Sequence, residues 1–386
     1  METRKLYYED CHLRKFTATV LECTPAEGGY RVVLDATAFY PEGGGQAADW
    51  GTLDGVNVRD VREKEGKILH FCDGALPVGA AVEGQIDWNR RFDLMQQHTG
   101  EHIVSGLLFQ KFGYMKTGFH VGADVMEVDF DGPLSPEDLS AIERRANEAV
   151  WADIPLQCRI PDPEELKTVT YRTKRELPWP VRIVQVPGYD SCACCGVHVA
   201  RTGEVGMIKI LSCTALRGGV RLEMVCGRRA YDHMTRIFEE NRRVSQAFSA
   251  PMHATSSAAV RMNEALASEK SRAIALQNRI LENVAESYVN FGDVLHFEPD
   301  LDGNALRFLA DKIAGVCGGR AAVFSGQEGN YAYCLAHRDG DLRDLNRAMT
   351  GALNGRGGGK PQFQQGTLRA AKEEILAFFR SFPGYS

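Results

Sequence analysis

The stretch from Arg90 to Gly113, RRFDLMQQHTGEHIVSGLLFQKFG, marks the point at which the periodicity of the sequence changes. The spacing of its large side chains fits a helix better than a strand; they include Phe92, Met95, Thr99, His102, Leu107 and Phe109. The runs before it are short, with Gly, Pro and Asp between them. We therefore expect a helix here that follows a β-rich region and begins a different one.

Residues 1–88 predict a small β-barrel. The runs TATVLEC, YRVVLDATAF and AAVEGQIDW are β-branched or alternating, and turn residues separate them at regular spacing. Residues 89–228 predict an α+β core, because strand-like VRIVQV and GVRLEMVC accompany a helical segment. That segment has Ser135 as its candidate N-cap, Pro136 at the first helical position and Asp138 to close a capping box.

The remaining sequence predicts a helical region and one further domain. Residues 229–289 are helical in pattern, and Pro251 divides them into two arms. Apolar residues of the second arm recur at three-, four- and seven-residue steps, as in an antiparallel helical hairpin or a short coiled coil. Residues 290–386 alternate strand-like and helical segments, which predicts a small α/β domain. The expected fold class is therefore α+β with several domains.

Composition limits the class of protein. The 386 residues suffice for roughly two to four domains, and the net charge of −6 argues against a general nucleic-acid coat while allowing a local basic face. No run of about eighteen apolar residues predicts a membrane span. The polar N-terminus lacks a signal-peptide core. Eleven Cys, an odd number at irregular spacing, favour a reducing cytoplasm, where clustered Cys and His more often bind metal.

Two histidines on the central helix are the first candidate metal ligands. His98 and His102 stand four residues apart, so their imidazoles share one helix face about one turn apart. This arrangement suits zinc. A single pair of this kind is weak evidence, because two histidines share a helix face by chance about as often as they do in a metal site.

A second pair strengthens the metal hypothesis. Cys194 and His198 lie within DSCACCGVHVARTGE, and with the two helical histidines they offer the four N and S donors of a tetrahedral zinc site. Two such pairs on separate elements favour a metal clearly over coincidence. Cys192 and Cys195 remain alternatives, and Cys195 is a genuine rival because it too could pair with His198.

Two glycine-rich stretches are further candidate sites. In FYPEGGGQAADWG, Gly43, Gly44 and Gly45 permit close backbone approach, and Gln46 follows with one donor and one acceptor group. A plain β-turn is the alternative. In NGRGGGKPQFQQG, the backbone amides beside Arg356 and Lys360 would suit phosphates, although the pattern of a P-loop is not met. A flexible loop is the alternative there.

These motifs, in this order, resemble the editing half of alanyl-tRNA synthetase, and more closely the free-standing alanyl-tRNA editing proteins of the long AlaX type. The resemblance covers nearly the whole chain and includes HVARTGEVGMIKI and GVRLEMVCGRRA after the Cys/His motif. It implies an ATP-independent, cytoplasmic hydrolase that removes serine, and in second place glycine, from mischarged tRNA(Ala). Its partner is then the mischarged tRNA(Ala), no membrane is expected, and a homodimer is a further expectation.

The resemblance also assigns roles to residues of this chain. It implies one zinc ion per chain, held by His98, His102, Cys194 and His198. It places the stretch from Gly43 to Gln46 beside the acceptor stem, and it gives tRNA contacts to the region of Arg356 to Lys360 in the C-terminal domain.

The sequence departs from the family at one point of this pattern. It has CCGVH where the family commonly has CGGTH. Cys195 then occupies the position of the first Gly, which weakens its claim as a ligand. Val197 replaces a Thr and removes a hydroxyl beside the site.

Hydrolysis of the aminoacyl ester needs an attacking water and charge stabilisation at the carbonyl oxygen. Zinc could lower the pKa of bound water or polarise the carbonyl, but four protein ligands make a closed site of the structural kind. Selection for serine requires a polar group facing its hydroxyl. Thr117 is the first candidate and Gln46 the second. Glu101 is expected to be solvated or behind the ligands more often than a base.

Two other functions fit parts of the pattern. HTGEH also matches the inverted zinc-peptidase motif H-x-x-E-H, which would make Glu101 a general base but leaves Cys194 and His198 unexplained. A zinc-stabilised module that binds tRNA without hydrolysing the ester is the second alternative. In that module, removal of zinc would unfold the protein.

Overall fold

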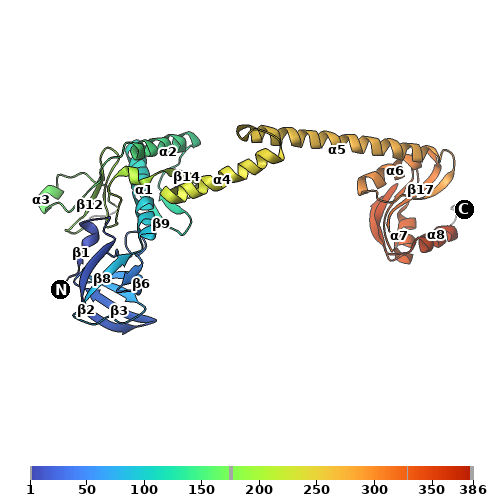
Figure 1. Cartoon of the computed structure of the whole chain (residues 1–386). Coiled ribbons are helices and arrows are strands. Elements are labelled where there is room, and N and C mark those ends of the chain that lie inside the picture. Colours follow the sequence, from blue (N-terminus) through green and yellow to red (C-terminus); the bar gives the residue numbers. More distant parts are fainter. Residues whose placement is uncertain (1, 174–176, 328, 383–386) are drawn as a thin grey trace. The chain divides into compact units, whose positions relative to one another are not determined.

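The structure is a computed structural model that describes residues 2–173, 177–327 and 329–382 (Figure 1). It divides into two compact units, Met1–Arg243 and Val244–Ser386. Several sheets and helices are present in it, so the expected mixed, multidomain class is confirmed. No helix in the described part of the chain is long and apolar enough to span a membrane.

Six strands near the N-terminus form a closed barrel in the order β2-β3-β7-β6-β5-β8. They are β2 (Lys15–Ala26), β3 (Gly29–Leu34), β5 (Gly51–Leu53), β6 (Val56–Lys64), β7 (Lys67–Cys72) and β8 (Ala81–Ile86). Every second residue of β8 is buried, as a strand with one face in a core requires. Two short strands, β1 (Arg4–Lys5) and β4 (Ala36–Thr37), pair in parallel beside the barrel, and the 3-10 helix η1 (Leu6–Tyr8) follows β1 directly.

Helix α1 (Trp88–Phe112) is the predicted central helix. The Asp87 side chain accepts from the backbone N–H of Arg90 at its start, and Gly113 ends it in the left-handed conformation with φ of 74°. Every residue from Leu94 to Leu108 is buried. A helix buried all round lies in the centre of a unit, which explains why its apolar stripe is indistinct in the sequence.

The two glycines inside α1 allow close packing. A Cβ on Gly100 would lie 2.2 Å from Sγ of Cys226, and one on Gly106 would lie 2.3 Å from the carbonyl oxygen of Tyr189. Both positions therefore exclude any larger side chain. The cost of glycine in a helix is offset here by the approach of neighbouring strands.

Two sheets and a helix surround α1 in the first unit. The four-stranded sheet has the order β14-β15-β10-β9 and the three-stranded sheet the order β11-β12-β13. Their strands are β9 (Lys116–Val121), β10 (Met126–Phe130), β11 (Gln157–Arg159), β12 (Ile183–Val186), β13 (Asp190–Ala193), β14 (Ile208–Leu216) and β15 (Gly219–Cys226). Helix α2 (Pro136–Trp151) begins as predicted, because Ser135 Oγ accepts from the N–H of Asp138. The short helices α3 (Pro163–Leu166) and η2 (Thr202–Val205) also belong to this unit.

The predicted break in the helical region is confirmed. Helix α4 (Gly227–Ala247) ends before Pro251, and η3 (Met252–Ala254) leads into α5 (Thr255–Glu286). The apolar residues of α5 are largely exposed, with Met262 51% and Ile280 64% accessible. The hairpin or coiled coil stays a prediction.

The second unit contains a five-stranded sheet with the order β16-β17-β18-β20-β19 and one apolar core on each face. Its elements are β16 (Gly292–Phe297), α6 (Gly303–Val316), β17 (Gly318–Gln327), β18 (Asn330–Ala336), α7 (Arg343–Ala352), β19 (Arg356–Lys360), β20 (Phe363–Leu368) and α8 (Lys372–Ser381). The glycine-rich stretch that includes Arg356 and Lys360 is an edge strand, so the flexible-loop alternative is wrong.

Candidate metal centre and adjoining cavity

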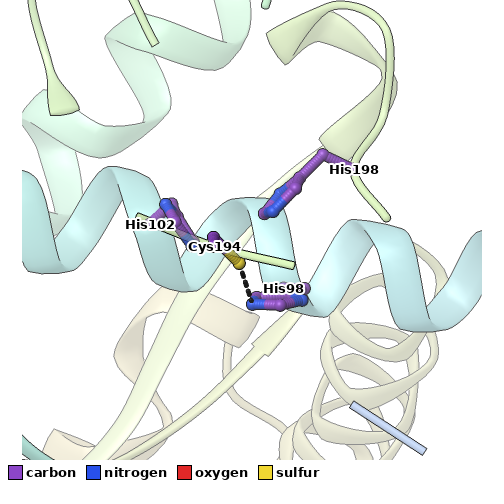
Figure 2. Close-up of side chains that lie close together, drawn as sticks. All are labelled: His98, His102, Cys194 and His198. Atoms are coloured by element: carbon purple, nitrogen blue, oxygen red, sulfur yellow. Dashed lines mark hydrogen bonds between the residues drawn. The ribbon is translucent and has the colours of Figure 1, made fainter. Parts of the chain in front are cut away.

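Four predicted ligands converge on one point in the first unit. Helix α1 contributes His98 and His102, and the chain after β13 contributes Cys194 and His198 (Figure 2). One donor atom from each of the four lies within 4.8 Å of every other. The three imidazoles are at most 2% exposed. The structure thus brings the two sequence motifs together.

Each imidazole is held through its Nδ1 atom. Nδ1 of His98 lies 2.8 Å from Oε1 of Gln46, and Nδ1 of His102 lies 3.0 Å from Oδ2 of Asp190. For His198 the partner is the hydroxyl of Thr99, at 3.2 Å. Held in this way, all three rings present Nε2 as the remaining donor atom.

The orientation of Gln46 fixes the tautomer of His98. The backbone N–H of Val197 also donates to Oε1 of Gln46, at 3.2 Å, so the atom between them must be oxygen. An oxygen accepts only, so Nδ1 of His98 carries the proton and donates it. Its Nε2 therefore has a free lone pair, which is what a metal ligand needs.

The arrangement passes a geometric test for zinc. Sγ of Cys194 lies 3.5 Å from Nε2 of His98. Two such atoms bound tetrahedrally at about 2.3 and 2.0 Å from one ion would be about 3.5 Å apart. Nε2 of His198 is buried and has no hydrogen-bond partner among the described residues, which marks it as a donor atom that needs a ligand. The residues therefore fit a zinc ion.

Burial sets the protonation of the cluster. It lowers the pKa of His98 and His198 well below the usual range, and the neighbouring imidazoles lower it further. Burial and the adjacent Cys195 raise the pKa of the Cys194 thiol to about 12. At neutral pH these two imidazoles are neutral and the thiol keeps its proton unless a cation displaces it.

The rival cysteines lie elsewhere. Cys195 is exposed, and its Sγ faces the hydroxyl of Tyr40 at 4.0 Å. Cys192 is buried and groups with His102 and Asp190 instead. Among the described residues, the set that contains three imidazoles has Cys194 as its sulfur.

The backbone that carries Cys194 is clamped from two sides. Nη1 of Arg182 donates to the carbonyl oxygens of Cys194 and Gly196, at 3.0 and 2.9 Å. The hydroxyl of Tyr8 donates to the carbonyl of Cys195 at 2.6 Å, and the Arg182 guanidinium lies 4.4 Å from the Tyr8 ring. These contacts fix the turn that aims the sulfur, and no local motif predicts them.

We expect Gly196→Ala to disrupt the metal centre. A Cβ there would lie 2.2 Å from Cε1 and 2.4 Å from Nδ1 of His98, whereas one on Gly74 would make ordinary contacts of 3.4 Å or more. The ring of His98 must then rotate away from its partners. Zinc affinity measured against a competing chelator should fall at least about tenfold, and Gly74→Ala should leave it unchanged. Equal affinities for the two variants would contradict this geometry.

A cavity of about 420 Å³ opens beside the cluster. Both helical histidines and Cys194 form part of its wall. The other lining residues are Gly44, Gly45, Met115, Lys116, Phe119, Arg172, Thr173, Leu177, Cys192, Ala193 and Cys195. A molecule in this cavity would lie directly against three of the four candidate ligands.

The glycine triplet forms a tight turn at the wall of this cavity. Gly43 and Gln46 exchange two backbone hydrogen bonds of 3.0 Å. Gly44 and Gly45 have φ of 59° and 87°, which favours glycine. A Cβ on Gly45 would lie 2.4 Å from the ring of Phe119. The stretch is therefore a β-turn that also shapes the cavity.

Two predicted selecting residues lie differently from expectation. Gln46 is fully buried and orients His98, while Thr117 is exposed and is not among the lining residues. Glu101 was expected to be solvated or to lie behind the ligands, and because it is 0% exposed the first of these two alternatives is wrong. Its carboxylate pairs with Lys116, at 2.7 Å, and with the hydroxyl of Ser105.

The pair of Glu101 and Lys116 is ionised. Burial alone would raise the pKa of Glu101, but Lys116 and the neighbouring histidines lower it far below its usual range. Burial opposes the charge on Lys116, and Glu101 raises its pKa. The Glu101 carboxylate is thus engaged in an ion pair with Lys116. The peptidase alternative, which needs Glu101 as base, finds no support in this geometry.

The predicted tRNA contacts of the second unit are both solvent-exposed. Arg356 and Lys360 stand at the two ends of β19. Lys360 lines a cavity of about 620 Å³ together with Arg307 and Phe363, and the Arg307 guanidinium lies 5.8 Å from the Phe363 ring. Cations beside an aromatic ring suit the backbone and bases of single-stranded RNA.

Three family models match the chain: tRNA synthetases class II (A) over residues 2–90, the threonyl and alanyl tRNA synthetase second additional domain over residues 181–223, and the DHHA1 domain over residues 282–382. The alanyl-tRNA editing protein AlaX-L of Pyrococcus horikoshii is 29% identical over 96% of both chains. The alanyl-tRNA editing protein Aarsd1 of Danio rerio is 25% identical over 97% of both. Among solved structures, the C-Ala domain of Aquifex aeolicus alanyl-tRNA synthetase matches 22% of this chain and 83% of its own, at 17% identity and a TM-score of 0.20. Over nearly its whole length the chain is therefore similar to proteins named as alanyl-tRNA editing proteins, which is the resemblance that its motifs predicted.

Proposed function

We propose that the protein is a zinc-dependent hydrolase that deacylates mischarged tRNA(Ala), chiefly seryl-tRNA(Ala), with glycyl-tRNA(Ala) as a second substrate. The observation that carries the proposal is the convergence of His98, His102, Cys194 and His198 at the wall of a cavity. Near full-length similarity to proteins named for alanyl-tRNA editing supports the substrate class.

The residues around the cavity have separable tasks. A bound zinc would supply Lewis acidity toward a carbonyl oxygen or water. Gln46, Asp190 and Thr99 orient the three imidazoles, and the turn of Gly44 and Gly45 limits the space available to the amino acid. Closing the reacting ester in such a cavity excludes bulk water and strengthens electrostatic interactions within it.

The same proposal assigns tRNA binding to both units. The turn from Gly43 to Gly45 would face the acceptor end, and Arg356 and Lys360 would contact the phosphate backbone of the tRNA. The domain division 1–88, 89–228, 229–289 and 290–386 is part of this proposal, with the last as the tRNA-binding domain. Exposed cations on an edge strand support backbone contacts that carry no sequence information.

The direct test compares three substrates. Seryl-, glycyl- and alanyl-tRNA(Ala) are incubated with the zinc-loaded protein, and the remaining ester is measured over time. The proposal expects the fastest loss for serine and little loss for alanine. Equal rates for serine and alanine would contradict editing, and stability of all three esters would contradict hydrolysis.

A second candidate function rests on the ligand set. Four protein donors are typical of closed, structural zinc sites. The alternative is a module that binds mischarged tRNA(Ala) and leaves the ester intact. In that case removal of zinc should unfold the first unit, whereas a catalytic zinc should be removable with loss of activity and little loss of structure.

We expect zinc binding to release about one proton per ion at pH 8 to 9. Cys194, with its pKa raised to about 12, holds a proton that a metal must displace, while imidazoles in general are neutral in this range. The affinity should therefore rise about tenfold per pH unit. Calorimetry in buffers of different ionisation enthalpy measures the proton count. A count near zero would contradict a protonated thiol in the metal-free protein.

A further inference from the structure

The wall of the cavity exposes positive charge and conceals the balancing negative charge. Lys116 and Arg172 both line the cavity. Their carboxylate partners, Glu101 and Asp190, have side chains 0% and 1% exposed and do not belong to the lining. No Asp or Glu occurs among the described lining residues. Among the residues that the structure describes, a molecule in the cavity therefore meets two cationic side chains and no carboxylate, which favours negatively charged groups.

Of the two cations, Arg172 is already paired with a carboxylate of the protein. Its Nε and Nη2 atoms donate to the two oxygens of Asp190, at 2.7 and 2.8 Å. The same carboxylate accepts from His102. This bidentate pair fixes Asp190 and, through it, the imidazole of His102.

Lys116 is held with less constraint. Its Nζ has one hydrogen-bond acceptor among the described residues, Oε2 of Glu101 at 2.7 Å. An ammonium group has three hydrogens to donate, so two remain for another partner. Nζ also lies 4.7 Å from the ring of Phe119, and that ring is 5.3 Å from the ring of His98. The ammonium is thus placed beside both the cavity and the ligand cluster.

On the basis of the proposed hydrolysis, we propose that the Lys116 ammonium is a catalytic residue that binds the carbonyl oxygen of the aminoacyl ester. Water forms a bond to the carbonyl carbon, and the electron pair of the C=O bond moves to that oxygen. When the pair returns, the bond to the ribose oxygen breaks. Solvent passes the proton lost by the water to the ribose oxygen, giving a free amino acid and a ribose hydroxyl. Lys116 keeps its proton throughout.

The four zinc ligands explain why a positive charge on Lys116 is needed at the carbonyl oxygen. Four protein donors occupy the usual coordination number of zinc, so a zinc that acts on the attacking water leaves the carbonyl oxygen in need of a separate cation. A fixed ammonium in a site that excludes water interacts strongly with a developing negative charge. Glu101 holds the ammonium in place and itself stays buried behind it.

The test separates the ammonium from its partner. Lys116→Met alone would leave Glu101 buried and unpaired, so the main variant is the double change Lys116→Met with Glu101→Gln. Lys116→Gln, which can still donate to Glu101, is the second variant in case the first does not fold. Lys111→Met is the control, because Lys111 is 47% exposed and its ion pair with Asp138 lies on the surface.

We expect both neutral variants to lose about 100-fold in kcat on seryl-tRNA(Ala), with KM within about threefold and zinc content unchanged. The control should match the wild type. A kcat within threefold of wild type in either folded variant overturns the proposal. A loss confined to KM does so too, because it indicates a phosphate contact. An inactive wild type refutes the proposed function itself, whereas an active wild type with active variants refutes only the role of Lys116.

Discussion

Cys194→Ala is expected to abolish zinc binding and deacylation together. Its sulfur is the one thiol in the cluster with three imidazoles, and it stands 3.5 Å from Nε2 of His98. Loss of one of four ligands should lower the zinc affinity by several orders of magnitude, since the remaining set lacks its single anionic donor. Metal content by mass spectrometry and hydrolysis of seryl-tRNA(Ala) measure the two effects.

Cys195→Ala is the matched control. The two thiols are neighbours in the chain, but Cys195 is exposed and faces Tyr40. Its removal should leave zinc content and rate within about threefold of the wild type. If Cys195→Ala lost the metal and Cys194→Ala kept it, the assignment of ligands would be reversed.

The largest effect on stability is expected from Asp49→Ala. Asp49 and Arg91 form an ion pair whose side chains are both 0% exposed, and it joins the barrel region to α1. The carboxylate also accepts from the backbone N–H of Tyr40 at 2.6 Å. Its removal leaves the Arg91 charge buried and uncompensated, so the free energy of unfolding should fall by roughly 3–5 kcal/mol.

Tryptophan fluorescence during urea unfolding measures this change in the first unit alone. All four tryptophans, Trp50, Trp88, Trp151 and Trp179, belong to that unit. Glu83→Ala is the control, because Glu83 and its partner Lys15 are both more than 60% exposed. A midpoint for Asp49→Ala equal to that of the control would contradict a structural role for the buried pair.

The ligand cluster was predictable because local rules decide it. Positions i and i+4 of a helix share one face, which places His98 beside His102 whatever surrounds the helix. Cys194 and His198 are close because only three residues separate them in the chain. The groups that orient the rings were not predictable, since Gln46 and Asp190 lie 52 and 88 residues from the histidines that they contact. Only the fold brings them together.

The burial of Glu101 and the glycine-rich strand β19 could not be predicted from the sequence. A glutamate between two helical histidines is usually solvated, but Lys116, fifteen residues away, allows Glu101 to be buried. A run of glycines has low β propensity, yet β19 forms because pairing with β20 supplies its hydrogen bonds. Tertiary contacts decide both cases.

The central claim is that the cluster of His98, His102, Cys194 and His198 binds a zinc ion on which ester hydrolysis depends. The most direct measurement is the rate of seryl-tRNA(Ala) deacylation by metal-depleted protein during stepwise return of zinc, with circular dichroism recorded at each step. The account predicts a rate that rises in proportion to zinc and reaches its maximum at one ion per chain, with a nearly constant spectrum. A rate independent of zinc, or a protein that refolds with zinc and still leaves the ester intact, would contradict it.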